Sequence, residues 1–245
     1  MKIAIYSANF GNYRNEINNI YNKHLIFNDS IDYYFFTDIK QTKPSKWKVI
    51  LTELKDKLSF MDTYRHTAKH IKWIVPDILN DYDIIFWVDS KCIYYVNIKI
   101  MKIIDLIDHN KDNIHFIKHN DRTNPIDEIN KTIEKKMEND KNATKFKEII
   151  NMTFASKLPD TRCIVYKNNN RNKNILKQVY DLLITHGLRR DQNVVQYAFL
   201  QHNSETNLKF LKPIHFKKNI VNIKKKIERK QERERKQERE RKQER

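Results

Sequence analysis

Short apolar runs alternate with helical patterns along most of the chain, and this alternation limits its fold more than any other feature. The clearest run, Asp83–Val88 (DIIFWV), is continuously apolar, as expected of a strand buried on both faces. Further strands are expected at Lys2–Ser7, Ile31–Thr37, Trp47–Leu51, Cys92–Val96, Ile114–Lys118 and Arg162–Tyr166. Helices are expected at Leu58–Leu79 with a break at Pro76, and at Ile98–Ile107, Glu128–Met137, Lys145–Met152, Asn174–Thr185 (with Gly187 as C-cap) and Asp191–Leu200. The pattern predicts an α/β fold with a mainly parallel central sheet flanked by helices.

The chain has only two glycines, Gly11 and Gly187. They lie too far apart to build a P-loop, a GxGxxG dinucleotide turn or a GxSxG nucleophile elbow. Any phosphate that binds here must therefore be held by side chains, helix ends or a metal ion.

The two cysteines, Cys92 and Cys163, cannot form a structural zinc site without several histidines, and no HExxH or paired CxxC occurs. So few cysteines indicate a reducing compartment without a disulfide framework. No apolar run approaches the roughly 18–20 residues of a membrane helix, and the first residues look like a strand rather than a signal peptide. We therefore expect a cytoplasmic protein. Heavy use of Ile, Asn and Lys indicates an AT-rich genome, with a viral source among the options.

Charge is concentrated at the carboxyl end, in a chain whose formal net charge is +17. Residues 217–245 contain five lysines followed by three ERKQER hexamers that each carry a net charge of +1, so this segment totals +8. The hexamers lack apolar residues and cannot form a coiled-coil seam. We expect one domain over residues 1–216 and a basic, low-complexity tail, helical or disordered. Such a tail is either a non-specific hook for nucleic acid and anionic surfaces or a neutral product of repeat expansion.

Polar groups follow three of the expected strands: the Ala8–Tyr13 loop, Asp38 and Asp89. Parallel sheets bind ligands at the carboxyl ends of their strands, where the strand order changes direction. Although an acidic residue after a strand is also a common cap, three such groups in one α/β chain predict a cleft there.

The segment Asp89-Ser90-Lys91 is the most informative of these. Nucleotide-sugar transferases use an aspartate at the end of a buried strand, usually in an Asp-x-Asp pattern, to hold a metal and a diphosphate. A carboxylate pair suits Mg²⁺ or Mn²⁺. Here Lys91 stands where the second carboxylate would be, and its ammonium group could stabilise a leaving diphosphate directly. The simpler alternative is a strand-end aspartate paired with Lys91 and without catalytic function.

Three other groups are candidates, each with a structural alternative. Arg65 and Lys69 share one face of a helix and could clamp phosphates, or form a solvated basic face. His119-Asn120-Asp121-Arg122 precedes Asp127-Glu128, where Arg122 could clamp a ligand and Glu128 act as acid or base, unless the carboxylates only cap a helix. Arg189-Arg190-Asp191-Gln192 opens a helix. Asp191 there is typical of an N-cap, and it is also a candidate general base beside Gln192.

Taken together and in order, these pieces resemble the turgor-regulation-defect/mucilage-related glycosyltransferase-like family, whose members have GT-A-type domains. The resemblance covers roughly residues 1–202 and is carried by SANFGNY, FFTD, Trp47, RHTAKH, DYDIIFWVDSK, HNDRTNPIDEI, LPDTRCIVYKN and RRDQNVVQYAF. The family's Trp-Ile-Asp strand with a lysine two positions later matches Trp87-Val88-Asp89 and Lys91. Its His-Pro-x-Arg…Glu motif matches His119, Arg122 and Glu128, and its Arg-Asp-Gln motif matches Arg190, Asp191 and Gln192. Departures at Asn120, Asn124, Pro125 and Ile126 leave the acceptor open.

The resemblance implies a GT-A-like glycosyltransferase that moves a sugar from a nucleotide-diphosphate donor to a glycan, protein or lipid acceptor. It implies donor binding by Asn9, Phe10, Tyr13, Asp38, Arg65, Lys69 and Lys91, with Phe10 or Tyr13 against the base. Acceptor or sugar binding falls to His119, Arg122, Arg190 and Gln192. Asp191 is the first candidate for the base and Glu128 the second. Asp89 would contact the ribose, the sugar or a metal, which is Mn²⁺ or Mg²⁺ unless Lys91 replaces it.

Two other functions compete with this hypothesis. One is a catalytically inactive GT-A-like scaffold that binds nucleic acid or anionic surfaces through the basic tail. The other is a metal-dependent nuclease or phosphatase, for which the sequence shows no second carboxylate cluster around Asp89.

Overall fold

The computed structural model of the protein describes residues 1–22, 25, 27–41, 43–97, 111–150 and 158–211. Its strands are β1 (Ile3–Ala8), β2 (Ile31–Thr37), β3 (Lys48–Leu51), β4 (Ile84–Val88), β5 (Ile114–Lys118), β6 (Pro159–Lys167) and β7 (Leu208–Leu211). Its α-helices are α1 (Thr63–Trp73), α3 (Pro125–Glu134), α4 (Asp140–Ile149), α5 (Asn170–Thr185) and α6 (Val195–Gln201). Short 3₁₀ helices are η1 (Tyr13–Tyr21), η2 (Asp77–Leu79), η3 (Ser90–Asn97), η4 (Asp191–Asn193) and η5 (Glu205–Asn207).

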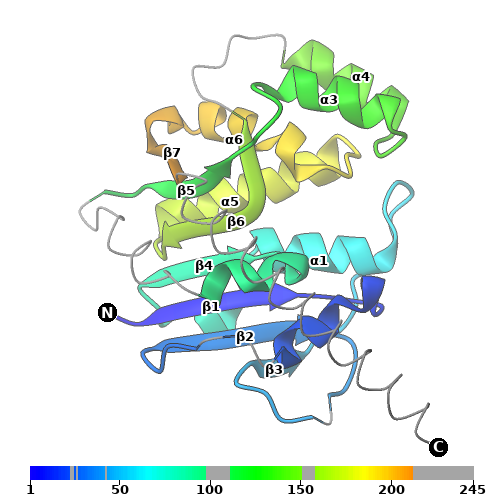
Figure 1. Ribbon diagram of the computed structural model, residues 1–245. Coiled ribbons are helices and arrows are strands. Elements are labelled where there is room, and N and C mark those ends of the chain that lie inside the picture. The colour runs from blue at the N-terminus through cyan, green and yellow to red at the C-terminus, as the bar shows by residue number, and fades with distance from the viewer. Residues whose placement is uncertain (23–24, 26, 42, 98–110, 151–157, 212–245) are drawn as a thin grey trace, which may run out of the picture.

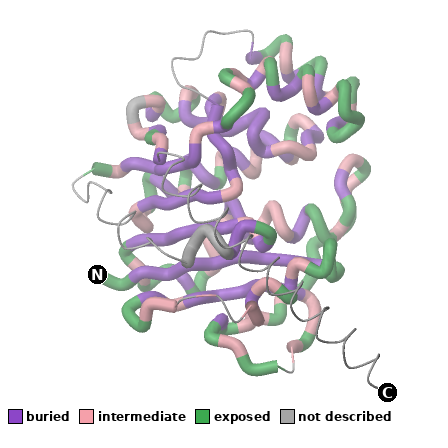
Figure 2. Tube along the Cα trace, viewed as in Figure 1, coloured by how far each residue is buried: buried purple, intermediate pink, exposed green. Residues whose placement is uncertain are grey.

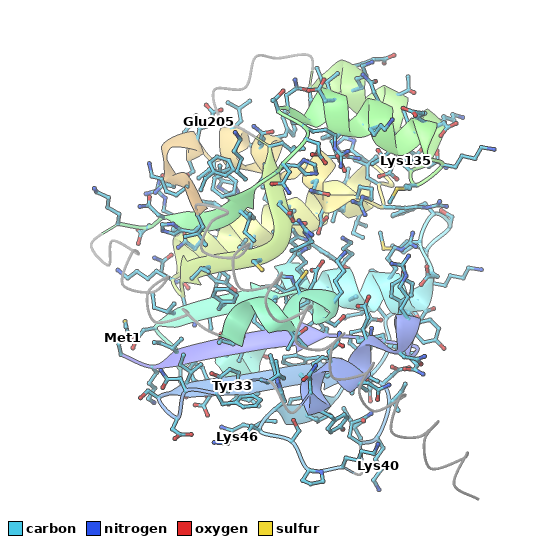
Figure 3. All side chains as sticks on the ribbon, in the orientation of Figure 1. Met1, Tyr33, Lys40, Lys46, Lys135 and Glu205 are labelled. Carbon is cyan, nitrogen blue, oxygen red and sulfur yellow. The ribbon has the colours of Figure 1, made fainter. Side chains whose placement is uncertain are left out.

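The strands form one sheet in the order β3-β2-β1-β4-β6-β5-β7 (Figure 1). Among the strands that the structure describes, β6 alone runs against its neighbours β4 and β5, and the other pairs are parallel. The labelled side chains of Lys46, beside β3, and Glu205, beside β7, mark the two edges of the sheet (Figure 3). This confirms the expected α/β fold with a mainly parallel central sheet flanked by helices.

Both faces of the sheet are covered, and its central strands are buried throughout (Figure 2). On one face, alternate strand residues such as Tyr6, Trp87 and Phe116 pack against α1, α3, α4, α5 and α6. On the other, Ile5, Phe86 and their neighbours pack against η1 and η3. Burial on two faces explains why the strands are continuously apolar rather than alternating.

Helix starts follow local capping signals. The side chains of Asp62, Asn124, Asn139 and Asn169 each accept a backbone N–H in the first turn of α1, α3, α4 and α5 respectively. Pro125 opens α3, a position that needs no amide proton. With these caps, α3, α4 and α5 each begin a few residues earlier than expected. The expected helix Leu58–Leu79 is shorter, because only α1 is α-helical there and η2 follows Pro76. Gly187, at φ +62°, ends α5 as expected of a C-cap glycine.

The strand expected at Cys92–Val96 is wrong, because this segment is the 3₁₀ helix η3. Its first turn closes directly after β4, where the Cys92 N–H donates to the Asp89 carbonyl at 2.7 Å. A further strand could not pair there, since β1 and β6 already occupy both sides of β4. The expected helix Asp191–Leu200 is also divided, into η4 and α6. Helix η1 and strand β7 were not expected.

Several expectations fall outside the described residues. They are the helix Ile98–Ile107, the domain boundary at residue 216 and the basic tail at 217–245. Among the residues that the structure does describe, no helix is both long and apolar enough to span a membrane.

Candidate active site

A cleft of about 800 Å³ opens where β1 and β4 end. These neighbouring strands lie at the point where the strand order reverses, since β2 and β3 extend to one side of β1 and β4 to the other. Of the described residues that line the cleft, ten are Lys or Arg and six are Asp or Glu. Because the cations outnumber the carboxylates, the cleft is suited to an anionic ligand.

The carboxylate of Asp191 is buried among the cleft residues and faces only donors. Its Oδ2 atom lies 2.8 Å from Nζ of both Lys69 and Lys72, and it accepts the Trp73 Nε1–H at 3.3 Å. Its Oδ1 atom accepts the Thr161 hydroxyl at 3.1 Å. The side chain does not cap a helix, which corrects the N-cap interpretation. Contacts from α1 and β6, distant in sequence, determine its environment.

These contacts fix the charges at the centre of the site. Burial acts to raise the pKa of Asp191, but Lys69 and Lys72 outweigh it and lower that pKa well below its usual range. Burial lowers the pKa of Lys69 to about 8, although Asp191 opposes the change. Burial also acts to lower the pKa of Lys72, but Asp191 and Asp89 together raise it. At neutral pH the site therefore holds an ionised Asp191 and a protonated Lys72.

Asp89 lies at the end of β4 and is the more accessible carboxylate, with 26% of its side chain exposed. Its Oδ1 atom accepts the Trp87 Nε1–H at 3.0 Å and lies 3.5 Å from Lys72 Nζ. Lys91 Nζ is 3.8 Å from Oδ2 and is about half exposed. The pairing with Lys91 is thus present, but Lys72 makes the closer contact.

The loop after β1 forms one rim of the cleft. Asn9 and Phe10 line the cleft but are buried, and Phe10 belongs to the core. Tyr13 also lines the cleft and is 52% exposed. Asp38 does not line it, because its carboxylate accepts the Gly11 N–H at 2.9 Å and holds the loop from behind. Tyr64, at the start of α1, adds a second exposed aromatic ring to this rim.

Gly11 sets the shape of this rim. Its φ is +61°, and a Cβ atom there would lie 2.8 Å from the Tyr64 ring. A Gly11→Ala variant is expected to lower the free energy of unfolding by about 1–2 kcal/mol through the left-handed backbone alone, with a further loss from the contact. Urea denaturation measures both parts. The double variant Gly11→Ala with Tyr64→Ala should recover the loss that comes from the contact with the Tyr64 ring. Equal losses of unfolding free energy in the single and the double variant would show that this contact costs nothing.

The wall opposite α1 is built by residues after β5 and β6. His119, Arg122 and Arg190 line the cleft, and Arg122 Nη2 lies 2.9 Å from His119 Nε2. Glu128 does not line it, being fully buried behind Arg122, with which it forms an ion pair, and 3.6 Å from Arg190. Gln192 lies beside them, its Oε1 accepting the Arg190 Nη2–H at 2.9 Å. Glu128 thus positions two arginines rather than facing a ligand.

Glu138, which the sequence did not single out, fastens the Arg189–Asp191 segment. Its carboxylate is buried and accepts the backbone N–H groups of Arg189 at 2.8 Å and Arg190 at 2.9 Å, as well as the Asn193 side chain at 3.2 Å. Burial raises the pKa of Glu138, although these hydrogen bonds act against that change. The residue therefore fixes the backbone immediately before Asp191.

Replacing Glu138 should loosen the cleft. A Glu138→Ala variant leaves three backbone donors, the N–H groups of Asn139, Arg189 and Arg190, without their acceptor and is expected to lose about 3 kcal/mol of unfolding free energy. Glu138→Gln keeps the shape and one acceptor oxygen, so it should lose about half as much. Urea denaturation of both variants is the measurement. Wild-type stability of Glu138→Ala would show that the segment is held by other contacts.

The structure brings together twelve of the fourteen site residues expected from the sequence and leaves two, Asp38 and Glu128, outside the cleft lining. The twelve are Asn9, Phe10, Tyr13, Arg65, Lys69, Asp89, Lys91, His119, Arg122, Arg190, Asp191 and Gln192. It adds Tyr64, Lys72 and the Asp160–Arg162 pair, in which the guanidinium of Arg162 clasps the carboxylate of Asp160. Lys72 could have been found, since it follows Lys69 by three positions on the same helix face.

The side chains around Asp89 do not fit a divalent cation. Mg²⁺ and Mn²⁺ require several oxygen ligands. Within the part of the chain that the structure describes, no group of three or more His, Cys, Asp or Glu side chains could hold a metal ion. Asp89 instead has the ammonium groups of Lys72 and Lys91 as neighbours.

No protein-family model and no curated protein sequence matches the chain. Similar solved structures include the galactosyltransferase LgtC in complex with donor and acceptor sugar analogues, at a TM-score of 0.48 and 8% identity over 86% of this chain and 73% of that one. Mouse xyloside xylosyltransferase 1 in its apo form has a TM-score of 0.48 and 9% identity over 87% of this chain and 86% of its own. The apo glycosyltransferase GlyE of Streptococcus pneumoniae TIGR4 has a TM-score of 0.45 and 11% identity over 88% of this chain and 46% of its own. At such identities, and with TM-scores below 0.5, these similarities carry no conclusion about the reaction, the donor or the acceptor.

Proposed function

We propose that the protein is a glycosyltransferase that uses a nucleotide-sugar donor. One observation carries the proposal: the cleft at the reversal point of the sheet contains two carboxylates, Asp89 and Asp191, that share the ammonium group of Lys72. Sugar transfer from a nucleotide diphosphate needs both charges, because negative charge grows on the leaving diphosphate while positive charge grows on the sugar. Resemblance of the motifs to the turgor-regulation-defect/mucilage-related family agrees with this proposal.

The donor lies along the rim made by β1, η1 and α1. The exposed rings of Tyr13 and Tyr64 offer faces on which a nucleobase can stack, whereas Phe10 is held in the core. Arg65 and Lys91 are accessible cations that reach the diphosphate. Asn9 completes the base side of the pocket, and Asp38 contributes by fixing the loop through Gly11.

During transfer, the bond between the anomeric carbon and the phosphate oxygen breaks, and that oxygen keeps the bonding electrons. Lys69 and Lys72 stabilise the resulting charge on the nucleoside diphosphate. Asp191 is too weakly basic to take a proton readily, since its pKa is held well below the usual range. We therefore propose that it stabilises the cationic sugar, while the oxygen of the acceptor hydroxyl bonds to the anomeric carbon and the accessible Asp89 takes the proton of that hydroxyl.

The acceptor enters from the wall formed after β5 and β6. His119, Arg122, Arg190 and Gln192 present hydrogen-bond donors and acceptors there, which suits the hydroxyl groups of a glycan. A protein or lipid acceptor remains compatible with the same wall. Glu128 serves the acceptor through the arginines that it positions.

Binding of nucleotides to the full chain tests the proposal. UDP, GDP and their sugar conjugates are titrated by calorimetry and by thermal shift, each with EDTA and with Mn²⁺. One nucleotide series should raise the unfolding midpoint, because a ligand bound only to the native state stabilises it. Tyr64→Leu should weaken that binding, while Ile78→Ala, at an exposed site outside the cleft lining, serves as the matched control.

Absence of binding by every nucleotide, in a protein shown to be folded, would reject the transferase. The remaining hypothesis would then be the non-catalytic scaffold with its basic tail. Its test is salt-dependent binding of RNA, DNA or anionic vesicles that disappears on removal of residues 217–245.

A further inference from the structure

Lys72 occupies a site that is built for an ammonium ion. Its Nζ atom lies 2.8 Å from Asp191 Oδ2 and 3.5 Å from Asp89 Oδ1, and its side chain is only 5% exposed. The indole rings of Trp73 and Trp87 lie beneath the same ammonium, with ring centroids 5.2 Å and 5.7 Å away. Two carboxylates and two aromatic faces thus surround a single cation.

The two tryptophans also fix the carboxylates. Trp73 donates its Nε1–H to Asp191 Oδ2 at 3.3 Å, and Trp87 donates its own to Asp89 Oδ1 at 3.0 Å. Each indole therefore holds one carboxylate in place while presenting its face to Lys72. The arrangement is preorganised, because the two carboxylates and the two indole rings already lie where they stabilise the ammonium group of Lys72.

We infer that Lys72 is the resident cation of the donor site, where it occupies the position between Asp89 and Asp191 that a divalent metal ion would need and binds the diphosphate without one. This inference rests on the proposed function for its choice of ligand. A metal ion bridging these carboxylates would require their oxygens as ligands at about 2.0–2.2 Å. The ammonium group already lies against the same two oxygens, and its charge would repel the metal.

The inference gives Lys72 and Lys91 different roles. Lys91 is about half exposed and lies 3.8 Å from Asp89 Oδ2, so water screens its charge. Lys72 is buried and held from four sides. We therefore assign the fixed contact with the diphosphate to Lys72. Lys91 provides a second, exposed contact with the same group.

Metal binding in the absence of sugar is the first test. Free Mn²⁺ is followed by electron paramagnetic resonance as protein is added. The proteins compared are the wild type, Lys72→Gln, and the double variant Lys72→Gln with Asp89→Asn. The wild type should leave millimolar Mn²⁺ free. Lys72→Gln should bind it at least tenfold more tightly, and the double variant should lose that gain. Wild-type binding of Mn²⁺ that disappears in Asp89→Asn would overturn the inference, as would a folded Lys72→Gln without any gain.

Anion binding by the wild type keeps the inference testable if Lys72→Gln does not fold. Inorganic pyrophosphate is titrated by calorimetry in EDTA and in Mn²⁺, with an expected difference of less than twofold between the two. Lys72→Arg should retain most of the affinity and Lys72→Met should lose at least tenfold, whereas Lys91→Gln, which removes the second diphosphate contact, should lose only about threefold. Pyrophosphate that binds only with Mn²⁺ would overturn the inference.

The two proposals fail separately. Pyrophosphate binding that depends on Lys72 and not on metal supports the inference even if no nucleotide sugar is consumed. Turnover of a nucleotide sugar only with Mn²⁺ rejects the resident cation while the transferase stands.

Discussion

An Asp191→Asn variant is expected to lose at least about a hundredfold in the rate at which the donor sugar is released. The same variant should lose about 3–5 kcal/mol of unfolding free energy, because the buried ammonium groups of Lys69 and Lys72 would lose the carboxylate that they share. Although asparagine has the shape of aspartate, every group that faces this side chain is a donor. Oδ2 meets Lys69, Lys72 and Trp73, and Oδ1 meets the Thr161 hydroxyl. Either orientation of an amide therefore directs its NH₂ group at other donors.

Stability and activity must be separated in this experiment. Ile175→Ala, in α5, removes a fully buried side chain outside the cleft lining and should lose a similar 2–5 kcal/mol. Urea denaturation gives the stability of both variants, and donor hydrolysis or transfer is measured well below both unfolding midpoints. Ile175→Ala should keep wild-type activity while Asp191→Asn loses it. Equal activities would remove Asp191 from the mechanism, and wild-type stability of Asp191→Asn would contradict the charge cluster.

The contrast between Asp89 and Asp191 shows what a linear pattern can reveal. Asp89 follows a five-residue strand that is buried in full, so its position at the carboxyl end of β4 follows from hydrophobicity alone. Asp191 carries the local signature of a helix cap, yet its partners come from α1 and β6. The contact with α1 spans 118 positions of sequence and the contact with β6 spans 30. Together they overrode the local preference, and no pattern in a single sequence encodes them.

Lys72 illustrates a second limit. It lies on the helix face already identified from Arg65 and Lys69, but in a chain with 48 Lys and Arg residues a buried lysine looks like an exposed one. Its burial follows from tertiary packing against Trp73 and Trp87. Glu138 was missed for the same reason, since it stands in a charged stretch and most of its partners belong to the distant segment around Asp191.

The fold was predictable in class and less so in topology. Strand β5 lies where the pattern places it, and β6 extends beyond the expected range. The residue pattern of β6 does not reveal its antiparallel direction, because that direction depends on the side of the sheet from which the preceding helices lead back into it. The four residues of β7 are too few for a periodic signal. Asp38 and Glu128 lie near the cleft but do not line it. Asp38 accepts the Gly11 N–H, and Glu128 pairs with Arg122 and Arg190. Sequence spacing does not reveal in which direction such side chains point.

Binding of the nucleotide to the wild type should weaken as the pH rises through about 8. Burial lowers the pKa of Lys69 to about 8, so its charge is lost there, whereas the raised pKa of Lys72 keeps that ammonium charged. Affinity should fall by up to about tenfold per pH unit over the next one to two units. Lys69→Arg, which stays charged, should remove the decline, and Lys69→Met should bind weakly at every pH. Calorimetric titration from pH 6.5 to 10 makes the comparison.

Stability should change in the opposite direction over the same window. Unfolded Lys69 keeps its proton up to its usual pKa of 10.5, so between pH 8 and 10.5 the unfolded chain binds more protons than the native one. The contribution of this residue to the free energy of unfolding therefore rises with pH, by up to about 3 kcal/mol across the window. The difference between wild type and Lys69→Met in urea isolates it from the other lysines and tyrosines. A group whose charge destabilises the native state yet strengthens ligand binding is retained for the ligand, so opposite slopes would identify Lys69 as part of the binding machinery. Parallel slopes, or a flat binding profile, would assign it to structure alone.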